Sequence, residues 1–454
     1  MSSHEFKVHR REPELLRPAK PTPHEFKYLS DIDDQEGFKF QLRGAQFYGH
    51  NPSMAGKDPV KILREAVAKT LVFYYPLAGR LREGPNRKLM MECNGEGIVF
   101  IEADAEATIE QLGDPLRPPF PCMEELLYDV PDTTDILNSP VILIQVTRLK
   151  CGGFVWAVRH NHTVCDGPAI AQFVTAVSEI SRGADAPSIL PVWERHLLNA
   201  SDPPRVTHQH LEYKESASKV DNTSESEDLA DRSFYFGSKE ISTLRSLLPP
   251  GRHSTFEVLT ACLWKCRTIA LQLHPMEEVR FMCVANARAK FDPPILPKGY
   301  YGNGFVFPVV ATIAGELCEN PVGYSLELVK KAKAKFSEEY VRSVASYLVI
   351  NGRPQFNPAR SFAVSDIKNA GFEDIDFGWG KALYGGTTEA GSSGFPGCSY
   401  LTSFTNKDGE RGIVASLSLP ATAMERFAEE LDVLLKKNQS TSGDIARNFV
   451  KSSL

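Results

Sequence analysis

The sequence predicts a two-domain protein of the mixed α/β (α+β) class. Its 454 residues exceed the length at which a single hydrophobic core usually stops growing. Strand and helix signals alternate along the first half of the chain. A polar stretch near the middle separates them from the strand and helix signals of the second half. We therefore expect an N-terminal domain at residues 1–195, an exposed crossover linker at 196–231 and a C-terminal domain at 232–454.

Composition excludes several classes of partner. The chain is 42% hydrophobic and 24% charged, which is ordinary for a globular protein in water. Its formal net charge of −6 argues against nucleic-acid binding, which requires a basic excess. The first residues lack the apolar segment of a secretory signal, and no window holds the roughly 18 apolar residues that a membrane helix needs. We expect no nucleic-acid or membrane partner.

The cysteines indicate a reducing compartment. There are nine, an odd number, and no two are spaced as Cys-x-x-Cys. This pattern favours reduced thiols and a cytoplasmic location over a disulfide framework. Cys262 and Cys266 share one face of a predicted helix, but with no further ligand nearby they are expected to be core residues, and we expect no metal site.

The first predicted helix begins at Asp58-Pro59. Apolar residues follow at helical spacing, and Pro76 and Gly79 must end the helix. The apolar positions are Ile62, Leu63, Ala66, Val67 and Leu71.

Two pairs of strands come next. Residues Lys88–Cys93 and Gly97–Ala103 are predicted as strands joined by the turn signal Asn94-Gly95. Residues Pro140–Leu149 and Gly153–Val158 form a second predicted hairpin. A helix then starts at Asp166 and ends at Arg182-Gly183, with apolar positions Ile170, Phe173, Val174, Val177 and Ile180 on one face.

The second half begins after a polar stretch at Lys214–Asp228, which is too rich in Ser and Glu to bury much apolar surface. The expected elements are a strand at Arg232–Phe236, helices at Thr255–Leu273, Tyr324–Glu339 and Ala421–Lys437, and a loop-rich region at Asp292–Asn303.

The hexapeptide His162-Thr-Val-Cys-Asp-Gly167 carries the strongest chemical signal, because it lies between an apolar strand and a helix start. A positioned base that removes a proton from an alcohol contributes about 10²–10⁴ in rate, and a histidine with a reference pKa of about 6.5 suits that role. Asp166 is expected either to pair with an arginine or to cap the helix. Gly167 is expected to allow a tight turn. Taken alone, a histidine followed by an aspartate four residues later is common.

A second motif is Asp376-Phe-Gly-Trp-Gly-Lys381. Two glycines that flank a tryptophan favour a structural turn with the aromatic ring as its packing anchor. A dinucleotide-binding loop is disfavoured, because its third glycine would fall at Leu383.

Other chemistries have weaker support. His160 and His162 would share one face of a strand, but no third metal ligand of suitable spacing adjoins them. The chain has no Gly-x-Ser-x-Gly nucleophile elbow and no Gly-x-x-x-x-Gly-Lys-Ser/Thr phosphate loop.

His-x-x-x-Asp-Gly in mid-chain, followed by Asp-Phe-Gly-Trp-Gly near the C-terminus, resembles the plant acyl-CoA-dependent acyltransferases of the BAHD family. The resemblance covers essentially the whole chain, and within the family it is closest to the alcohol acyltransferases that include benzyl alcohol O-benzoyltransferases. The family resemblance includes the stretches Tyr75–Arg80, Ser254–Glu257, Asn286–Arg288, Tyr301–Asn303 and Phe377–Lys381. The closer match to the alcohol acyltransferases rests on Pro18–Thr22, Leu29–Asp34 and Gly378–Gly385.

The resemblance implies two chloramphenicol-acetyltransferase-like domains, each a mixed β-sheet flanked by helices, with a solvent channel between them. His162 would be the catalytic general base at the centre of the channel. Asp166 would point away from the channel and pair with Arg288, so that Asp166, Gly167 and Arg288 support the catalytic loop. Many alcohol-acylating members carry Ala where this chain has Gly167. CoA binding or fold support is implied for Ser254, Thr255, Asp376, Phe377, Gly378, Trp379 and Gly380.

The implied function is transfer of a benzoyl, acetyl or similar acyl group from CoA to a hydroxyl of a small alcohol or specialised metabolite, which gives an ester. Acyl-CoA would be a co-substrate, with no permanently bound cofactor, and the protein would be a monomer. Two alternatives stay open: N-acylation of an amine, and a non-catalytic acyl-CoA-binding homologue.

Overall fold

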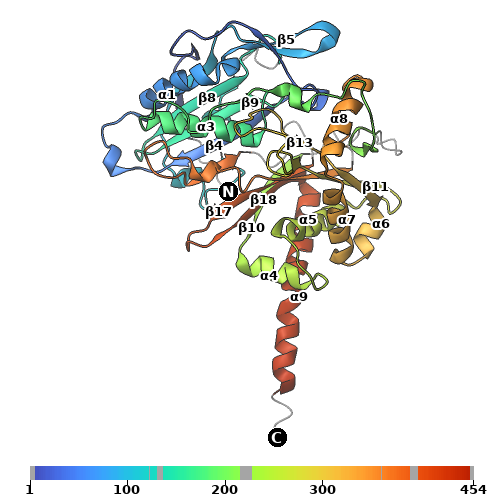
Figure 1. The fold of residues 1–454 in the computed structure, drawn as a ribbon. Helices are drawn as coiled ribbons and strands as arrows, with labels where there is room; N and C mark the ends of the chain where they lie inside the picture. The colour runs from blue at the N-terminus through green and yellow to red at the C-terminus, as the bar shows by residue number, and fades with distance from the viewer. Residues whose placement is uncertain are drawn as a thin grey trace.

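A computed structural model describes residues 6–121, 123–129, 136–214, 228–358, 360–388 and 397–449, with side chains described up to Lys436 in the last helix. Two large mixed β-sheets form the frame, one of seven strands and one of six (Figure 1). Each sheet has its own helices, which gives the predicted α/β organisation.

The seven-stranded sheet is built mainly from the first half of the chain. Its strands follow the order β1-β7-β8-β9-β4-β16, with β2 also paired to β7. Only β7 and β8 run parallel, and the β8–β9 pair is the predicted hairpin. The bounds are β1 Val8–Arg10, β2 Glu14–Leu16, β4 Gln41–Tyr48, β7 Ile98–Ala105, β8 Ile142–Leu149, β9 Phe154–Asn161 and β16 Tyr384–Thr387.

Helices α1 (Pro59–Phe73) and α3 (Gly167–Ser181) pack against each other and share one apolar core with this sheet. Their apolar stripes are the predicted ones, and Trp156 of β9 is fully buried in the same core. Aspartate caps both helices, since the Asp58 side chain accepts from the Val60 amide and the Asp166 side chain from the Ala169 amide. Side-chain capping therefore fixes where each helix begins.

The six-stranded sheet is formed by the second half of the chain, in the order β10-β18-β17-β15-β11-β14. The helices α4, α5, α6, α7 and α9 pack together beside it, with Trp264 of α5 fully buried (Figure 1). The strands are β10 Leu229–Phe236, β11 Glu278–Cys283, β14 Val309–Ile313, β15 Ser361–Asp366, β17 Cys398–Thr405 and β18 Arg411–Pro420. The helices are α4 Ser238–Ser246, α5 Thr255–Leu271, α6 Ala314–Glu319, α7 Val322–Ala334 and α9 Ala421–Phe449.

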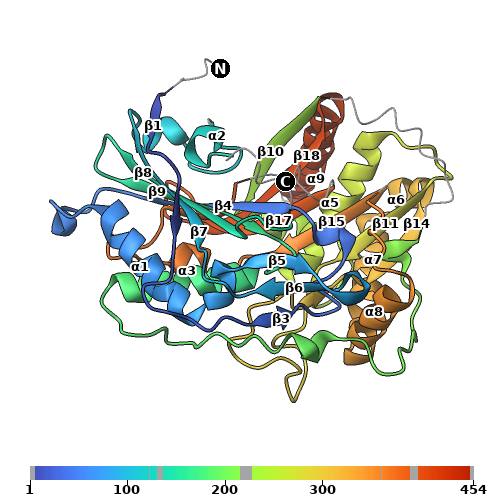
Figure 2. The same ribbon diagram turned by 90° about the horizontal axis from the view of Figure 1, so that it is seen from above.

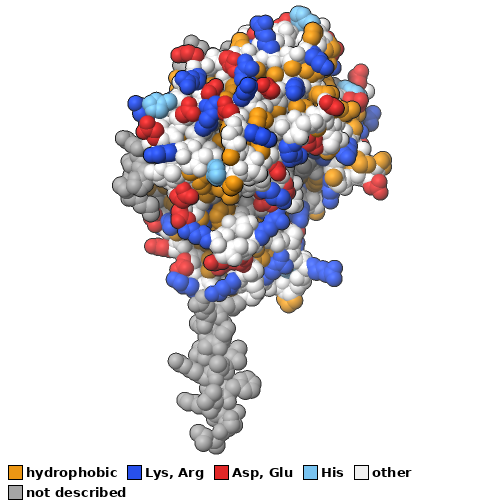
Figure 3. Space-filling model, turned by 90° about the vertical axis from the view of Figure 1, so that its left-hand side faces the viewer, with side chains coloured by type: hydrophobic (Ala, Val, Ile, Leu, Met, Phe, Trp, Pro, Cys, Tyr) orange, Lys and Arg blue, Asp and Glu red, His pale blue; other side chains and the backbone are white. Residues whose placement is uncertain are grey.

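Smaller elements complete the described fold. They are a three-stranded sheet of β3 (Phe26–Tyr28), β5 (Arg80–Glu83) and β6 (Leu89–Glu92), a two-stranded sheet of β12 (Ala285–Asn286) and β13 (Phe305–Val306), and the helices α2 (Met123–Leu126) and α8 (Glu338–Ile350). Elements of the two large sheets meet where β16 contacts β17. Figure 2 shows β4 of the seven-stranded sheet next to β17 of the six-stranded sheet. On the face shown in Figure 3, acidic and basic side chains are interspersed.

The expected hairpin at Lys88–Cys93 and Gly97–Ala103 is wrong. Both strands form, but β6 pairs with β3 and β5, whereas β7 enters the seven-stranded sheet. Most side chains of β7 are buried on both faces, which requires a place inside a large sheet rather than in a two-stranded ribbon. Asn94-Gly95 therefore connects two sheets.

The single helix expected at Tyr324–Glu339 is also wrong. Helix α7 ends at Ala334, and α8 begins at Glu338. The Ser337 hydroxyl accepts from the Tyr340 amide, so this residue caps a new helix instead of extending the first.

The linker at 196–231 is not uniformly exposed. Leu198, His210, Glu212 and Tyr213 are buried, and β10 already begins at Leu229. Most of the polar stretch, residues 215–227, lies outside the described part of the chain. The second half of the chain also contributes one strand to the seven-stranded sheet, because β16 pairs with β4.

Of the helices that the structure describes, none has the length and apolar character to span a membrane.

Candidate active site

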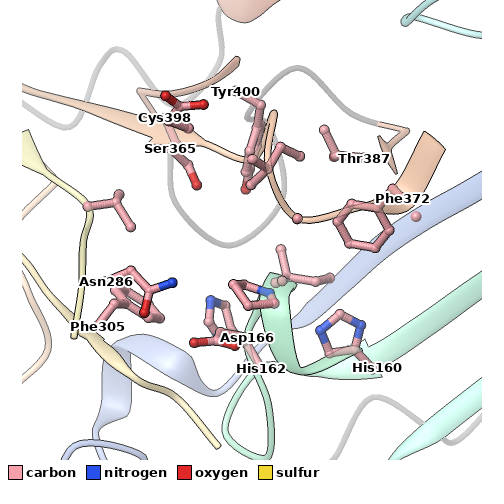
Figure 4. Close-up of a pocket in the computed structure, with 18 of the residues that line it drawn as sticks. His160, His162, Asp166, Asn286, Phe305, Ser365, Phe372, Thr387, Cys398 and Tyr400 are labelled. Carbon is pink, nitrogen blue, oxygen red and sulfur yellow. The ribbon is translucent and has the colours of Figure 1, made fainter. Parts of the chain in front are cut away.

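A cavity of about 460 Å³ is lined by residues of both large sheets. Figure 4 shows His160 and His162 pointing into it from the seven-stranded sheet, opposite Ser365, Cys398 and Tyr400 of the six-stranded sheet. Much of the remaining wall is aromatic, formed by Phe38, Phe40, Phe305, Phe307, Phe356 and Phe372. The cavity thus combines a few polar groups with a mainly apolar lining, as small-molecule sites do.

His162 follows β9 directly and is held on several sides. Its amide donates to the Phe40 carbonyl over 2.9 Å, and its own carbonyl accepts from the Asn303 side chain over 2.8 Å. The imidazole stacks on Phe38, with ring centroids 4.5 Å apart and planes 3° from parallel. Phe40 packs edge-on against the same ring, and the two ring centroids are 5.0 Å apart. Backbone and ring are therefore both fixed before any substrate binds.

Burial sets the charge state of His162. The side chain is buried, and loss of solvation lowers its pKa below the ordinary value of 6.5. Its own backbone carbonyl, the Asp166 charge and Asn303 oppose that shift without reversing it. The imidazole is therefore neutral near pH 7 and ready to accept a proton.

Asp166 has every carboxylate position occupied by a donor. Oδ1 accepts from the Ala169 amide over 3.0 Å and from Nη2 of Arg288 over 2.9 Å. Oδ2 accepts from Nη1 of Arg288 over 2.8 Å and from the Gly304 amide over 2.9 Å. The two expectations for Asp166, an arginine pair and a helix cap, are met by one carboxylate. Such a saturated group holds structure rather than relays protons.

A buried network behind His162 was not anticipated as part of the site. The Asn303 amide nitrogen donates to the carbonyls of His162 and Thr163 and to Oδ1 of Asp33. Oδ2 of Asp33 accepts from Arg195 over 2.7 Å, and Arg195 also donates to the Val164 carbonyl.

The side chains of Arg195 and Asp33 are 1% and 0% exposed, so the His162–Val164 backbone rests on a fully buried ion pair. The sequence held only an indirect signal for it. Asp33 and Asn303 lie in stretches that resemble the family, but nothing in their spacing indicates that they meet.

The Asp376–Gly380 segment lies outside the cavity lining and forms a tight turn. Oδ1 of Asp376 accepts from the amides of Gly378 over 2.7 Å and Gly380 over 2.9 Å. The φ angles of the two glycines, +107° and +94°, require the freedom of glycine. Phe377 and Trp379 bury their rings against aromatic residues of β4 and β9. The segment is the structural turn that its sequence predicts.

This turn also contacts the C-terminal end of α3. Arg182 donates to the Asp376 carbonyl and Ser181 donates to the Phe377 carbonyl. The start of α3 is held by Asp166, so both ends of this helix are attached to segments from the second half of the chain.

Ser254 and Thr255 are not among the residues that line the cavity. Ser254 caps α5, in a reciprocal pair in which its hydroxyl accepts from the Glu257 amide and Glu257 accepts from the Ser254 amide. The Thr255 hydroxyl accepts from Arg245 over 2.9 Å.

Gly167 was expected to allow a tight turn, but its backbone conformation here does not require glycine. Gly167 is the first residue of α3, and its φ lies outside the left-handed region. A Cβ added there would meet only Cγ2 of Ile367, at 3.9 Å. Alanine would fit this position without strain.

Other candidate groups carry no chemistry of their own. Burial raises the pKa of the Cys165 thiol, which keeps it protonated and packed. Within the described ranges, no three His, Cys, Asp or Glu side chains come together as metal ligands would.

Known proteins resemble this chain over nearly its whole length. The Transferase family profile matches residues 6–434. The benzyl alcohol O-benzoyltransferase of Petunia hybrida is 57% identical over 434 residues, which cover 95% of this chain and 94% of the relative. Alcohol acyl transferase 1 allele GSa of Malus domestica is 51% identical over 97% of this chain and 96% of its own. The 13-hydroxylupanine O-tigloyltransferase of Lupinus albus is 53% identical over 95% of each chain.

Solved structures show the same fold at low sequence identity. Vinorine synthase matches with a TM-score of 0.73 and 20% identity over 94% of this chain and 98% of its own. TRI101 of F. graminearum, complexed with coenzyme A and T-2 mycotoxin, matches with a TM-score of 0.71 and 16% identity over 88% of this chain and 96% of its own. The two-domain fold expected from the sequence is confirmed.

Proposed function

This chain belongs to the BAHD transferase family, and we propose that it is an acyl-CoA-dependent O-acyltransferase that converts a small alcohol into an ester. The observation that carries the proposal is the neutral, rigidly held imidazole of His162 at a cavity lined by both sheets. Relatives more than 50% identical over nearly the whole chain are named for ester formation on alcohols.

In the proposed reaction, His162 acts as general base in a single displacement. Its imidazole accepts the proton of the acceptor hydroxyl while the oxygen attacks the thioester carbonyl of acyl-CoA. The tetrahedral oxyanion collapses, the carbon–sulfur bond breaks, and the imidazolium returns its proton to the CoA thiolate. Ester and free CoA leave, and the enzyme ends in its starting protonation state. No covalent acyl-enzyme is needed.

The supporting residues have distinct proposed roles. Asp166 and Arg288 fix the start of α3 and with it the loop that carries His162. Fold support is the role that we propose for Ser254, Thr255 and the Asp376–Gly380 turn, because their polar groups are engaged in capping and turn contacts. Contact between these residues and CoA stays a prediction.

The aromatic lining favours an aromatic acyl group or acceptor. Phe38, Phe40, Phe305 and Phe372 offer ring faces and edges against which a benzoyl or benzyl group would pack. The Petunia relative is named for both groups. We therefore propose benzoyl-CoA and benzyl alcohol as the first substrates to test, ahead of acetyl-CoA and aliphatic alcohols.

The test is a matrix of acyl-CoA donors against alcohols and the corresponding amines, with products identified by mass spectrometry. Ester and free CoA in equal amounts are expected from at least one alcohol pair. Amide formation at higher kcat/KM than ester formation would make the enzyme an N-acyltransferase. Acyl-CoA binding without turnover on any acceptor would identify a non-catalytic homologue. A monomeric state and a cytoplasmic location belong to the same proposal, and gel filtration and cell fractionation test them.

A further inference from the structure

The cavity contains a second histidine that the proposed reaction does not use. His160 lies on β9, paired in register with Leu42 of β4 and Ile142 of β8. It is 3% exposed. Neither ring nitrogen makes a hydrogen bond of standard geometry to the residues that the structure describes, although the backbone of Cys165 is close enough to oppose the fall in its pKa. Buried polar groups are nearly always paired, so this side chain requires an explanation.

The ring is aimed at the space that a substrate would fill. Figure 4 shows the His160 imidazole pointing into the cavity on the Phe372 side, on the same strand face as His162. The neighbours given by strand register and alternation are Leu42 and Val158, both apolar and both on the cavity wall. His160 is thus an isolated polar group on an apolar stretch of that wall.

A second base and a metal ligand are both poor descriptions of His160. Burial lowers the pKa of this imidazole to about 3, with the neighbouring His162 acting in the same direction, so it stays neutral at physiological pH. A metal would need further ligands, and the carboxylate of Asp166 is already saturated by four N–H donors. A neutral imidazole carries one N–H donor and one acceptor nitrogen. A hydroxyl group, itself donor and acceptor, complements either nitrogen.

We propose that His160 is a substrate-recognition residue that binds a second hydroxyl group, one that is not acylated, carried on the acyl group or on the acceptor. This rests on the proposed acyltransferase function. It makes hydroxylated aromatic substrates, rather than their unsubstituted parents, the preferred class. A parent substrate, which lacks the second hydroxyl group, would leave the imidazole buried and unpaired. This free-energy cost arises only with the parent substrate, so the selectivity for the hydroxylated substrate is large.

Two arms of one experiment separate the two sources of the hydroxyl group. In the first arm, benzoyl-CoA and its three ring-hydroxylated isomers compete with one another as donors, and benzyl alcohol is the common acceptor. In the second arm, benzyl alcohol and the three hydroxybenzyl alcohols compete with one another as acceptors, and benzoyl-CoA is the common donor. We expect one isomer in one arm to exceed its parent in kcat/KM by about tenfold or more. Its methoxy counterpart, which lacks the donor, should lose that advantage.

Three variants assign the preference to the residue. His160→Leu removes both nitrogens at similar volume and should abolish the preference. His160→Gln keeps a donor and an acceptor and should restore part of it. His50→Leu is the matched control, an exposed histidine that is not among the cavity-lining residues, and should leave the preference unchanged.

The outcomes distinguish this inference from the proposed function. If the wild-type enzyme makes esters but shows no preference in either arm, the role of His160 is refuted and the acyltransferase function stands. The same holds if His160→Leu keeps the preference. If the wild-type enzyme makes no ester from any pair, the proposed function itself fails. The comparison of hydroxy and methoxy substrates needs no variant, so a missing preference refutes the role of His160 even if His160→Leu does not fold, and a reduced preference in His160→Gln then assigns it to this residue.

Discussion

The carboxylate of Asp166 and the guanidinium of Arg288, 122 residues apart in sequence, form a two-pronged ion pair with N–O distances of 2.8 and 2.9 Å. The carboxylate is 4% exposed and the guanidinium 19% exposed. The same carboxylate caps α3, so one side chain joins the loop that carries His162, a helix start and a segment from the second half of the chain.

Replacing Asp166 by Ala should destabilise the protein strongly. The change leaves the Arg288 charge without its partner in a mostly buried site and removes the cap of α3, for a loss of about 3–5 kcal/mol in the free energy of unfolding. Thermal melting monitored by circular dichroism measures it. Arg288→Ala should behave similarly. An Asp166→Ala protein that is fully stable but slow would instead assign Asp166 to proton relay.

Replacing His162 by Ala should reduce kcat by about 10²–10⁴ and change the melting temperature little, because the substitution leaves in place the hydrogen bonds from Asn303 and Arg195 that hold the backbone of residues 162–164. Product formation is measured with the best donor and alcohol from the matrix. His50→Ala, at an exposed position, is the control. Near-normal turnover in the His162→Ala protein would refute the general-base role.

The pH dependence of catalysis should reflect the buried position of His162. Because burial lowers its pKa below 6.5, the imidazole is neutral throughout the physiological range. The value of kcat/KM should therefore be flat around pH 7 and fall only in acid, with a midpoint below 6.5. A midpoint above 6.5 in a full pH–rate profile would contradict a desolvated base.

His160 should make the protein less stable in acid. The unfolded chain binds a proton at its ordinary pKa of 6.5, whereas the folded state does so only near pH 3. Between these values the unfolded state binds more protons, so stability falls as pH decreases, by about 1.4 kcal/mol per pH unit for this group. Urea unfolding of the wild type and His160→Gln at pH 7 and pH 5 should show a smaller loss in the variant, by about 2 kcal/mol. Equal losses would show that the ring is solvated.

Gly167→Ala and Gly380→Ala should have opposite consequences. Gly167 has room for a methyl group and no positive φ, so the helix propensity of Ala should leave stability unchanged or raise it by up to about 1 kcal/mol. Gly380 also has open space around it, but its φ of +94° is strained for Ala, which should cost about 1–2 kcal/mol. Melting temperatures of the two variants test the pair, and equal destabilisation of both would contradict it.

Local signals predicted the parts of the fold that depend on local physics. The starts of helices α1 and α3 were placed to within one residue, because apolar spacing and an aspartate cap define each of them. Strand β15 was missed because it pairs with β11 and β17, which lie far from it in the chain. Strands β17 and β18 form a hairpin across residues 406–410, and its turn signal, Asp408-Gly409, was overlooked. The merged helix at 324–339 failed because a single serine cap, Ser337, outweighed a continuous helical pattern.

In the site as well, the local motif was predicted and the long-range contacts were not. The motif around His162 is contiguous, and the sequence therefore identified it. The Asn303 contact to the His162 carbonyl spans 141 residues, and the Asp33–Arg195 pair spans 162, so neither could be read from spacing. The position of the His160 ring at the cavity wall depends on what β4 and the Phe372 segment place around it, and the sequence did not specify these neighbours either.

Strand β16 has a consequence for how the protein is made. It covers the outer edge of β4, yet it lies near the end of the chain. During synthesis, the edge of β4 stays unpaired until the ribosome has passed Thr387. An unpaired strand edge can hydrogen-bond with a strand of another chain. The first half of this protein therefore depends on the last quarter to be finished, and truncated chains should aggregate rather than fold as separate domains.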